Sequence, residues 1–116
     1  MTVNSRIIDD NILVIELEGE LSIFFKEEVE NLVQENVDNS IYKFIFDMSK
    51  VTYIDSSGLS ILILAGNTSF KNGQKVKIVS PTAQVKYVID IARIGQILSY
   101  YDDIDSAIES FKEDED

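Results

Sequence analysis

One tetrapeptide in the middle of the chain, Asp55-Ser56-Ser57-Gly58, has residue types suited to reversible modification. It lies where the pattern predicts the start of a helix, and the free N–H groups and dipole of a helix start favour negative charge. A phosphate on Ser56 or Ser57 would be tolerated there, and it would add about −1.5 to −2 charges to one surface. The turn therefore predicts a charge switch.

The same turn also has a purely structural interpretation. Asp55 would cap the helix, the serines would satisfy early N–H groups, and Gly58 would allow tight packing. The tetrapeptide by itself does not separate the two interpretations, so its setting must decide.

The chain contains no histidine and no cysteine. This excludes a Ser-His-Asp triad, an imidazole base, a thiolate zinc site and a disulfide framework. The remaining carboxylates, lysines, tyrosines and hydroxyls show no cluster at ligand spacing, so we predict neither a metal site nor a cofactor. A small enzyme that uses carboxylates and Ser57 is an alternative for which the sequence offers no base.

The net charge of −11 argues against a nucleic-acid partner. Residues 56–101 carry five basic side chains and one acidic one, whereas both flanking segments are acidic. This basic middle is either a solvated patch or a face for an acidic or phosphorylated partner.

Residues 1–10 lack the pattern of a secretory signal. The longest uncharged stretch, residues 56–70, has only 15 residues and includes several polar ones, too few apolar residues to span a bilayer. We therefore expect a cytoplasmic protein with no membrane partner.

Hydrophobic periodicity predicts the elements that position the serine turn. We expect five strands, over residues 6–8, 12–18, 43–47, 75–79 and, as a short edge strand, 97–98; Gly19 would end the second of them. We expect four helices, over residues 24–36, 57–70, a stretch beginning at Pro81, and 105–112. Ser22 would cap the first helix, and Asp103 or Asp105 would cap the last. This order predicts a single-domain α/β fold over residues 1–112, followed by an acidic tail at 113–116. The sheet would be mixed and mostly parallel, with four to five strands, about four helices and an N-terminal β-hairpin.

The helix after the serine turn is apolar on more of its circumference than one buried face requires. Either neighbours cover it on both sides or one edge is exposed for a partner. On the second interpretation, we predict a partner-binding edge comprising Ser57, Gly58, Leu59, Ser60, Ile61 and Leu62.

The stretch from Phe44 to Leu59 closely resembles the signature of the STAS family. The resemblance covers nearly the whole chain and includes the following further segments: Gly19-Glu20-Leu21, Gly73, Ile94-Gly95 and Ser106-Ala107-Ile108. Stand-alone domains of this kind resemble bacterial anti-sigma factor antagonists, so the resemblance implies a STAS-like fold and a regulatory binding function.

The resemblance also implies a partner-switching cycle. The unphosphorylated antagonist would bind an anti-sigma factor that is also a serine kinase, and phosphorylation would end the binding. The family's phosphoacceptor falls on Ser57, with Asp55, Ser56, Gly58 and Ser22 around it, and a PPM-type serine phosphatase would reset it. Family antagonists often have Asp where this chain has Ser22, and some STAS domains act without phosphorylation.

An aspartyl-phosphate receiver is the alternative from another class. It is suggested by Asp9-Asp10 and by Asp47 at a predicted strand end. The acidic pair of a receiver lies between a strand and a helix, whereas here another strand follows, and the chain has no Lys-Pro pair. The alternative therefore fits the pattern less well.

Overall fold

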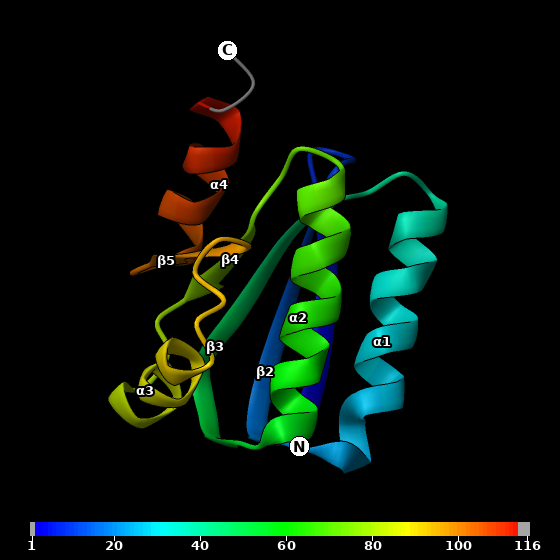
Figure 1. The fold of residues 1–116 in the computed structure, drawn as a ribbon. Coiled ribbons are helices and arrows are strands. Elements are labelled where there is room, and N and C mark those ends of the chain that lie inside the picture. Colours follow the sequence, from blue (N-terminus) through cyan, green and yellow to red (C-terminus); the bar gives the residue numbers. More distant parts are fainter. Residues whose placement is uncertain (1, 114–116) are drawn as a thin grey trace.

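The apolar runs assemble into a five-stranded sheet in the order β1-β2-β3-β4-β5 (Figure 1). The computed structural model describes residues 2–113, and its elements follow in chain order: β1 (Thr2–Ile8), β2 (Ile12–Leu21), α1 (Ile23–Asp38), β3 (Lys43–Ile54), α2 (Ser56–Lys71), β4 (Val76–Val79), α3 (Ala83–Ile91), β5 (Leu98–Tyr101) and α4 (Ile104–Glu113). Only the β1–β2 pair is antiparallel. The predicted fold class and N-terminal hairpin are confirmed.

Apolar side chains cover both faces of the sheet, because successive residues of a strand point in opposite directions. Leu13, Ile15 and Leu17 of β2 belong to the larger core, which also contains buried residues of α1, α2 and α3. Ile12 and Val14 belong to a smaller core that packs against α4. The helices α1 and α2 lie side by side on one face, as Figure 1 shows.

Strands β2 and β3 are longer than the sequence predicts. Gly19 does not end β2; with a φ of 106° it lies where the pairing register between β2 and β3 shifts. Beyond Asp47, buried residues of β3 recur at every third position, at Met48, Val51 and Ile54. Irregularities of register, such as β-bulges, hide the period-2 pattern of an ordinary strand. The prediction that β3 ends near Asp47 is therefore wrong.

The smaller elements differ from prediction by a few residues. Strand β1 starts at Thr2 rather than near Arg6, and Pro81 precedes the N-cap Thr82 instead of lying in the first turn of α3. Helix α4 extends through Glu113, so the first residue assigned to the acidic tail belongs to the helix. The rest of that predicted tail, 114–116, lies outside the described residues.

The start of α4 provides a pH-dependent element of stability. The Ser106 N–H donates to Asp103 Oδ1 at 2.7 Å, and this bond holds the pKa of Asp103 below its usual value. Because the folded-state pKa is lowered, the stabilisation is present above the ordinary pKa of about 3.9 and is lost as the pH falls through the lowered value. We expect Asp103→Ala to have a lower Tm than wild type at neutral pH, and we expect this difference in Tm to become smaller at acidic pH. A difference in Tm that does not change with pH would contradict this assignment.

Candidate functional site

The serine turn forms the first turn of α2, as the sequence predicts. Asp55 has extended backbone angles at the N-cap, and its Oδ1 accepts a hydrogen bond from the Gly58 N–H at 3.0 Å. The Asp55 carbonyl accepts from the Leu59 N–H at 2.9 Å and so begins the helical ladder. Asp55 therefore caps the helix, and this capping bond does not use the hydroxyl of Ser56 or Ser57.

Gly58 packs against the end of β2. A Cβ added at this position would lie 2.5 Å from the Leu21 carbonyl oxygen and 2.6 Å from Ile54 Cγ1. The Asp55 N–H also approaches the Leu21 carbonyl, at 3.4 Å. Absence of a side chain at Gly58 thus allows the start of α2 to pack directly on the β2–α1 junction.

Ser57 is half-buried on the second residue of α2, whereas Ser56 and Ser60 are exposed. Ser60 Oγ donates to the Ser56 carbonyl at 3.0 Å, so that hydroxyl is bonded within its own helix. The first-turn N–H groups of an α-helix have no intrahelical acceptors. Ser57 therefore carries a hydroxyl at a point whose backbone favours an anion.

Ser22 lies one residue after Leu21, at the same junction. It is the N-cap residue of α1, as predicted, but its side chain makes no capping hydrogen bond; its carbonyl accepts from the Phe25 N–H at 3.1 Å. The contact of Leu21 with Gly58 brings Ser22 and the serine turn to one end of the molecule.

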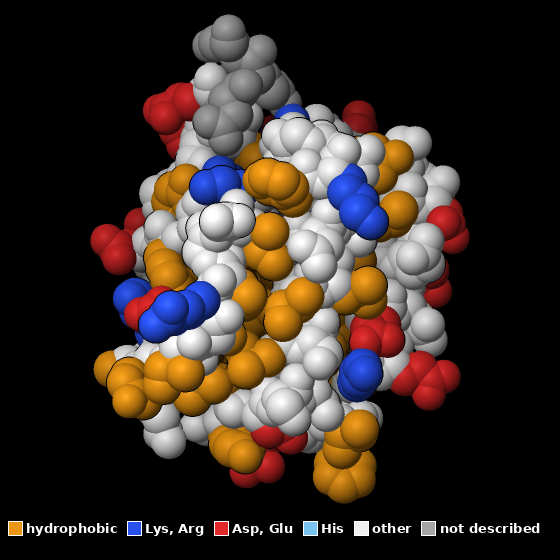
Figure 2. Space-filling view, in the orientation of Figure 1, with side chains coloured by type: hydrophobic (Ala, Val, Ile, Leu, Met, Phe, Trp, Pro, Cys, Tyr) orange, Lys and Arg blue, Asp and Glu red, His pale blue; other side chains and the backbone are white. Residues whose placement is uncertain are grey.

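Exposed apolar side chains flank this end. Phe24, in the first turn of α1, is 86% exposed, and Ile23 beside it and Tyr53 near the end of β3 are also exposed. Figure 2 shows hydrophobic side chains protruding where Figure 1 places the start of α1. The sequence prediction missed these residues, although Ile23 and Phe24 are apolar residues next to the predicted N-cap Ser22 and so gave a usable signal.

Three predicted partner-binding residues, Gly58, Ile61 and Leu62, are buried. Ile61 and Leu62 are buried in the larger core, because their positions on α2 turn toward the sheet. The exposed edge of α2 therefore does not include these two side chains, which corrects the predicted edge. Leu59 is half-buried and Leu64 is exposed, so α2 has both a buried face and an exposed edge.

The acidic residues that suggested a receiver are not brought together. Asp9 and Asp10 form the tight turn between β1 and β2, each with positive φ. Lys43 of β3 pairs with Ile12, which lies just after that turn, so Lys43 marks the level of the turn in the sheet. Asp47 lies four residues further along β3. At about 3.3 Å per residue, this is about 13 Å along the sheet, too far for a shared acidic site.

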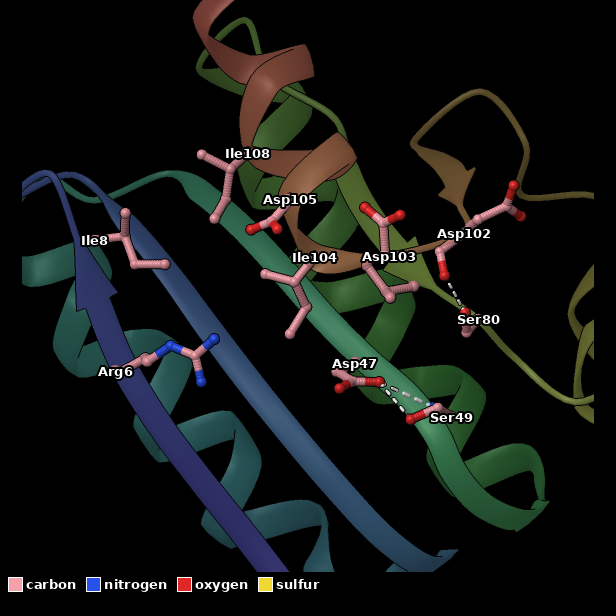
Figure 3. A pocket seen from close by; sticks show the side chains of 11 residues that line it. Arg6, Ile8, Asp47, Ser49, Ser80, Asp102, Asp103, Ile104, Asp105 and Ile108 are labelled. Atoms are coloured by element: carbon pink, nitrogen blue, oxygen red, sulfur yellow. Dashed lines mark hydrogen bonds between the residues drawn. The ribbon is translucent and has the colours of Figure 1, made fainter.

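A pocket of about 390 Å³ lies on the α4 side of the sheet, away from Ser57 (Figure 3). Two of its four acidic side chains stabilise the fold: Asp47 Oδ1 accepts from the Ser49 N–H at 3.1 Å, and Asp103 caps α4. Within residues 2–113, no group of three acidic side chains has a geometry that could hold a metal ion.

Loss of the α2 cap should destabilise the protein measurably. We expect Asp55→Ala to lower the free energy of unfolding by about 1 kcal/mol, because the Gly58 N–H loses its acceptor. Asp55→Ser, which can still cap, should recover most of the loss in urea unfolding. Equal losses in both variants would show that the cap bond is not the cause.

The fold and the serine turn together define a single-domain α/β protein with a half-buried serine at a helix start. The chain belongs to the STAS domain family, whose model matches residues 4–107. No curated protein matches it in sequence. Among residues 2–113, no helix has the length and apolar character needed to cross a membrane.

Several solved structures share the fold. A Thermotoga maritima protein proposed as an anti-sigma factor antagonist is 24% identical, with a TM-score of 0.84 over 93% of this chain and 92% of its own. The anti-sigma factor antagonist SpoIIAA in its unphosphorylated form is 16% identical, with a TM-score of 0.84 over 96% of each chain. The phosphorylated form of Bacillus SpoIIAA is 15% identical, with a TM-score of 0.78 over 95% of this chain and 99% of its own.

Proposed function

We propose that this protein is an anti-sigma factor antagonist whose binding is controlled by phosphorylation of Ser57. The unphosphorylated protein binds an anti-sigma factor and thereby frees a sigma factor for transcription. The protein is a binding module in this proposal, and the anti-sigma factor, acting as a serine kinase, supplies the catalysis.

The position of Ser57 carries the proposal. The residue is partly exposed on a helix start that the Asp55 cap and the Gly58 contact hold in place. A defined serine position suits a kinase, because phosphoryl transfer depends on orienting the attacking hydroxyl. Membership of the STAS family and similarity in fold to both phosphorylation states of SpoIIAA support this proposal.

Phosphorylation would change the surface more than the fold. The kinase would transfer the γ-phosphoryl group of ATP to Ser57 Oγ, ADP would be the leaving group, and a base of the kinase would take the hydroxyl proton. The Gly58 N–H is already bonded to Asp55, but the other N–H groups of the first turn can donate to the new anion, so the helix tolerates it. The surroundings of the phosphate would be acidic because of the Asp55 carboxylate and apolar because of the exposed Phe24 and Tyr53. A partner that docks there would have to desolvate the phosphate, which is unfavourable.

The proposed partner surface follows the exposed side of this end. It includes Ser57, Leu59 and Ser60 from α2, with Phe24 and Tyr53 beside them. Gly58 contributes by setting the position of the helix start. A PPM-type serine phosphatase would remove the phosphate, and because the kinase uses ATP we place the cycle in the cytoplasm.

A kinase assay tests the proposal directly. The purified protein is incubated with its cognate anti-sigma factor and labelled ATP, and the modified residue is mapped by mass spectrometry. We expect one phosphoserine at Ser57 and no label in Ser57→Ala, whereas Ser56→Ala should still be labelled. Undiminished label in Ser57→Ala would refute the assignment, and binding without any phosphorylation would leave an antagonist without the switch.

A further inference from the structure

One edge of the sheet is open to solvent along the whole of β1. Within residues 2–113, β1 pairs only with β2, so about half of its backbone N–H and C=O groups point outward with no strand beside them. Five of its seven residues are exposed, and its register against β2 runs from Thr2 to Ile8 without a shift. The strand at the other edge, β5, has only four residues. β1 therefore presents the longer edge of the sheet.

This edge lacks the usual obstacles to pairing with a further strand. Natural proteins block an exposed edge with Pro, Lys, a β-bulge or a covering element. β1 contains no Pro and no Lys, and its one charged residue, Arg6, forms an ion pair with Glu16 of the neighbouring β2. The outward backbone groups of β1 are therefore available to another extended chain.

A groove of about 350 Å³ lies beside this edge, between β1 and α1. Val3 and Leu32 are half-buried, pack against the larger core and form the apolar part of the groove. Glu28 and Glu35 are exposed and lie on the same stripe of α1 as Leu32, because the three residues recur at helical spacing. Within residues 2–113 neither carboxylate takes part in an ion pair. The groove is thus acidic, and its charges are not neutralised.

The side chains of β1 alternate between this groove and the opposite face of the sheet. Val3 and Ser5 line the groove beside α1, whereas Arg6 and Ile8 line the pocket on the α4 side, where Figure 3 shows them. A strand added beside β1 would continue the alternation. Every second side chain of that strand would therefore lie on the side of Glu28 and Glu35.

We propose that the outer edge of β1 binds an extended basic segment of a partner protein as a sixth strand of the sheet. Main-chain hydrogen bonds to β1 hold the segment, and Lys or Arg side chains at alternate positions pair with Glu28 and Glu35. The two glutamates are seven residues apart on α1, about 10 Å along the helix. Side chains two residues apart on a strand are separated by about 7 Å, so two long basic side chains can reach both carboxylates.

Charge favours a basic partner over a second copy of this chain. Two copies paired through β1 would bring two sets of Glu28 and Glu35 to one interface, between chains that each carry a net charge of −11. Like charges placed together oppose association, whereas a basic strand is attracted to the same groove. This inference does not depend on the proposed function, because none of these residues belongs to the serine turn.

The test uses the full chain and a short synthetic peptide in which Lys and Thr alternate. Titration should shift the amide NMR signals of β1 and of Glu28 and Glu35, and the exposed amides of β1 should exchange more slowly with solvent. Two further peptides carry N-methyl groups, one on every Lys and the other on every Thr. Only one of the two should bind, because a strand pairs with an edge through one alternate set of its N–H groups.

Charge reversal completes the test. Glu28→Lys combined with Glu35→Lys should weaken peptide binding about tenfold. Glu109→Lys combined with Glu113→Lys makes the same change in net charge at exposed positions of α4 and should change the Kd by less than about twofold.

Three results would each overturn the proposal. They are equal effects of the two double variants, equal binding of the two N-methylated peptides, and titration without any change at β1. Sedimentation of the protein alone tests the remaining occupant: we expect a monomer, and a dimer that loses its contact when β1 is altered would assign the edge to a second copy instead.

Discussion

Ser57→Asp should weaken binding to the anti-sigma factor about a hundredfold, or about 3 kcal/mol, because it places an unpaired charge in an interface with apolar surroundings. The fold should stay intact, since an acidic residue in the first turn of a helix is stabilising by a few tenths of a kcal/mol. Calorimetric titration measures the binding, and thermal unfolding measures the stability.

Two variants separate charge at the site from other effects. Ser57→Ala removes the hydroxyl without adding charge and should keep wild-type affinity within about threefold, a change of less than 1 kcal/mol. Ser5→Asp adds the same charge at an exposed position of β1 and should also bind normally. If Ser57→Asp bound as tightly as Ser57→Ala, Ser57 would not be a charge switch.

Gly58→Ala should lower the free energy of unfolding by about 2 kcal/mol, which is the usual cost of overpacking. The added methyl group would meet the Leu21 carbonyl at 2.5 Å, and a backbone atom cannot rotate away. The start of α2 would have to move off the β2–α1 junction, so we also expect slower phosphorylation of Ser57. Chemical denaturation and the kinase assay measure the two effects.

The other glycines provide matched controls for this prediction. Gly95→Ala has nothing within 4 Å of the new methyl group and should change stability by less than about 0.5 kcal/mol. Gly66→Ala would meet the end of the Ile97 side chain, which can shift, so its effect should lie between the two. Equal effects at Gly58 and Gly95 would contradict the close-packing argument.

Local chemistry explains why the sequence predicted the capped turn at the start of α2. Asp55 caps α2 by accepting from the N–H of a residue only three positions away in the chain. The helix ends at Lys71, with Asn72 as its C-cap before Gly73, which has a φ of 79°. Such contacts join near neighbours, so the residue types and their spacing are enough to predict them. The order of the elements was predictable for the same reason.

The contacts that the sequence missed join distant segments. The length of β3 depends on register shifts against β2, and the burial of Ile61 and Leu62 depends on which side of an apolar helix meets the sheet. Neither has a signal in a single segment, because a helix that is apolar all round does not indicate its own inner face.

The serine turn has some features that the sequence determines and others that depend on the tertiary structure. The sequence determined that a capped helix starts at Asp55 and that Ser57 lies in its first turn. Only the tertiary structure placed Gly58 against Leu21, left Phe24 exposed beside that end, and buried Ile61 and Leu62 in the core. The physical reason is that capping bonds close within one turn, whereas burial depends on the packing of residues far apart in the chain.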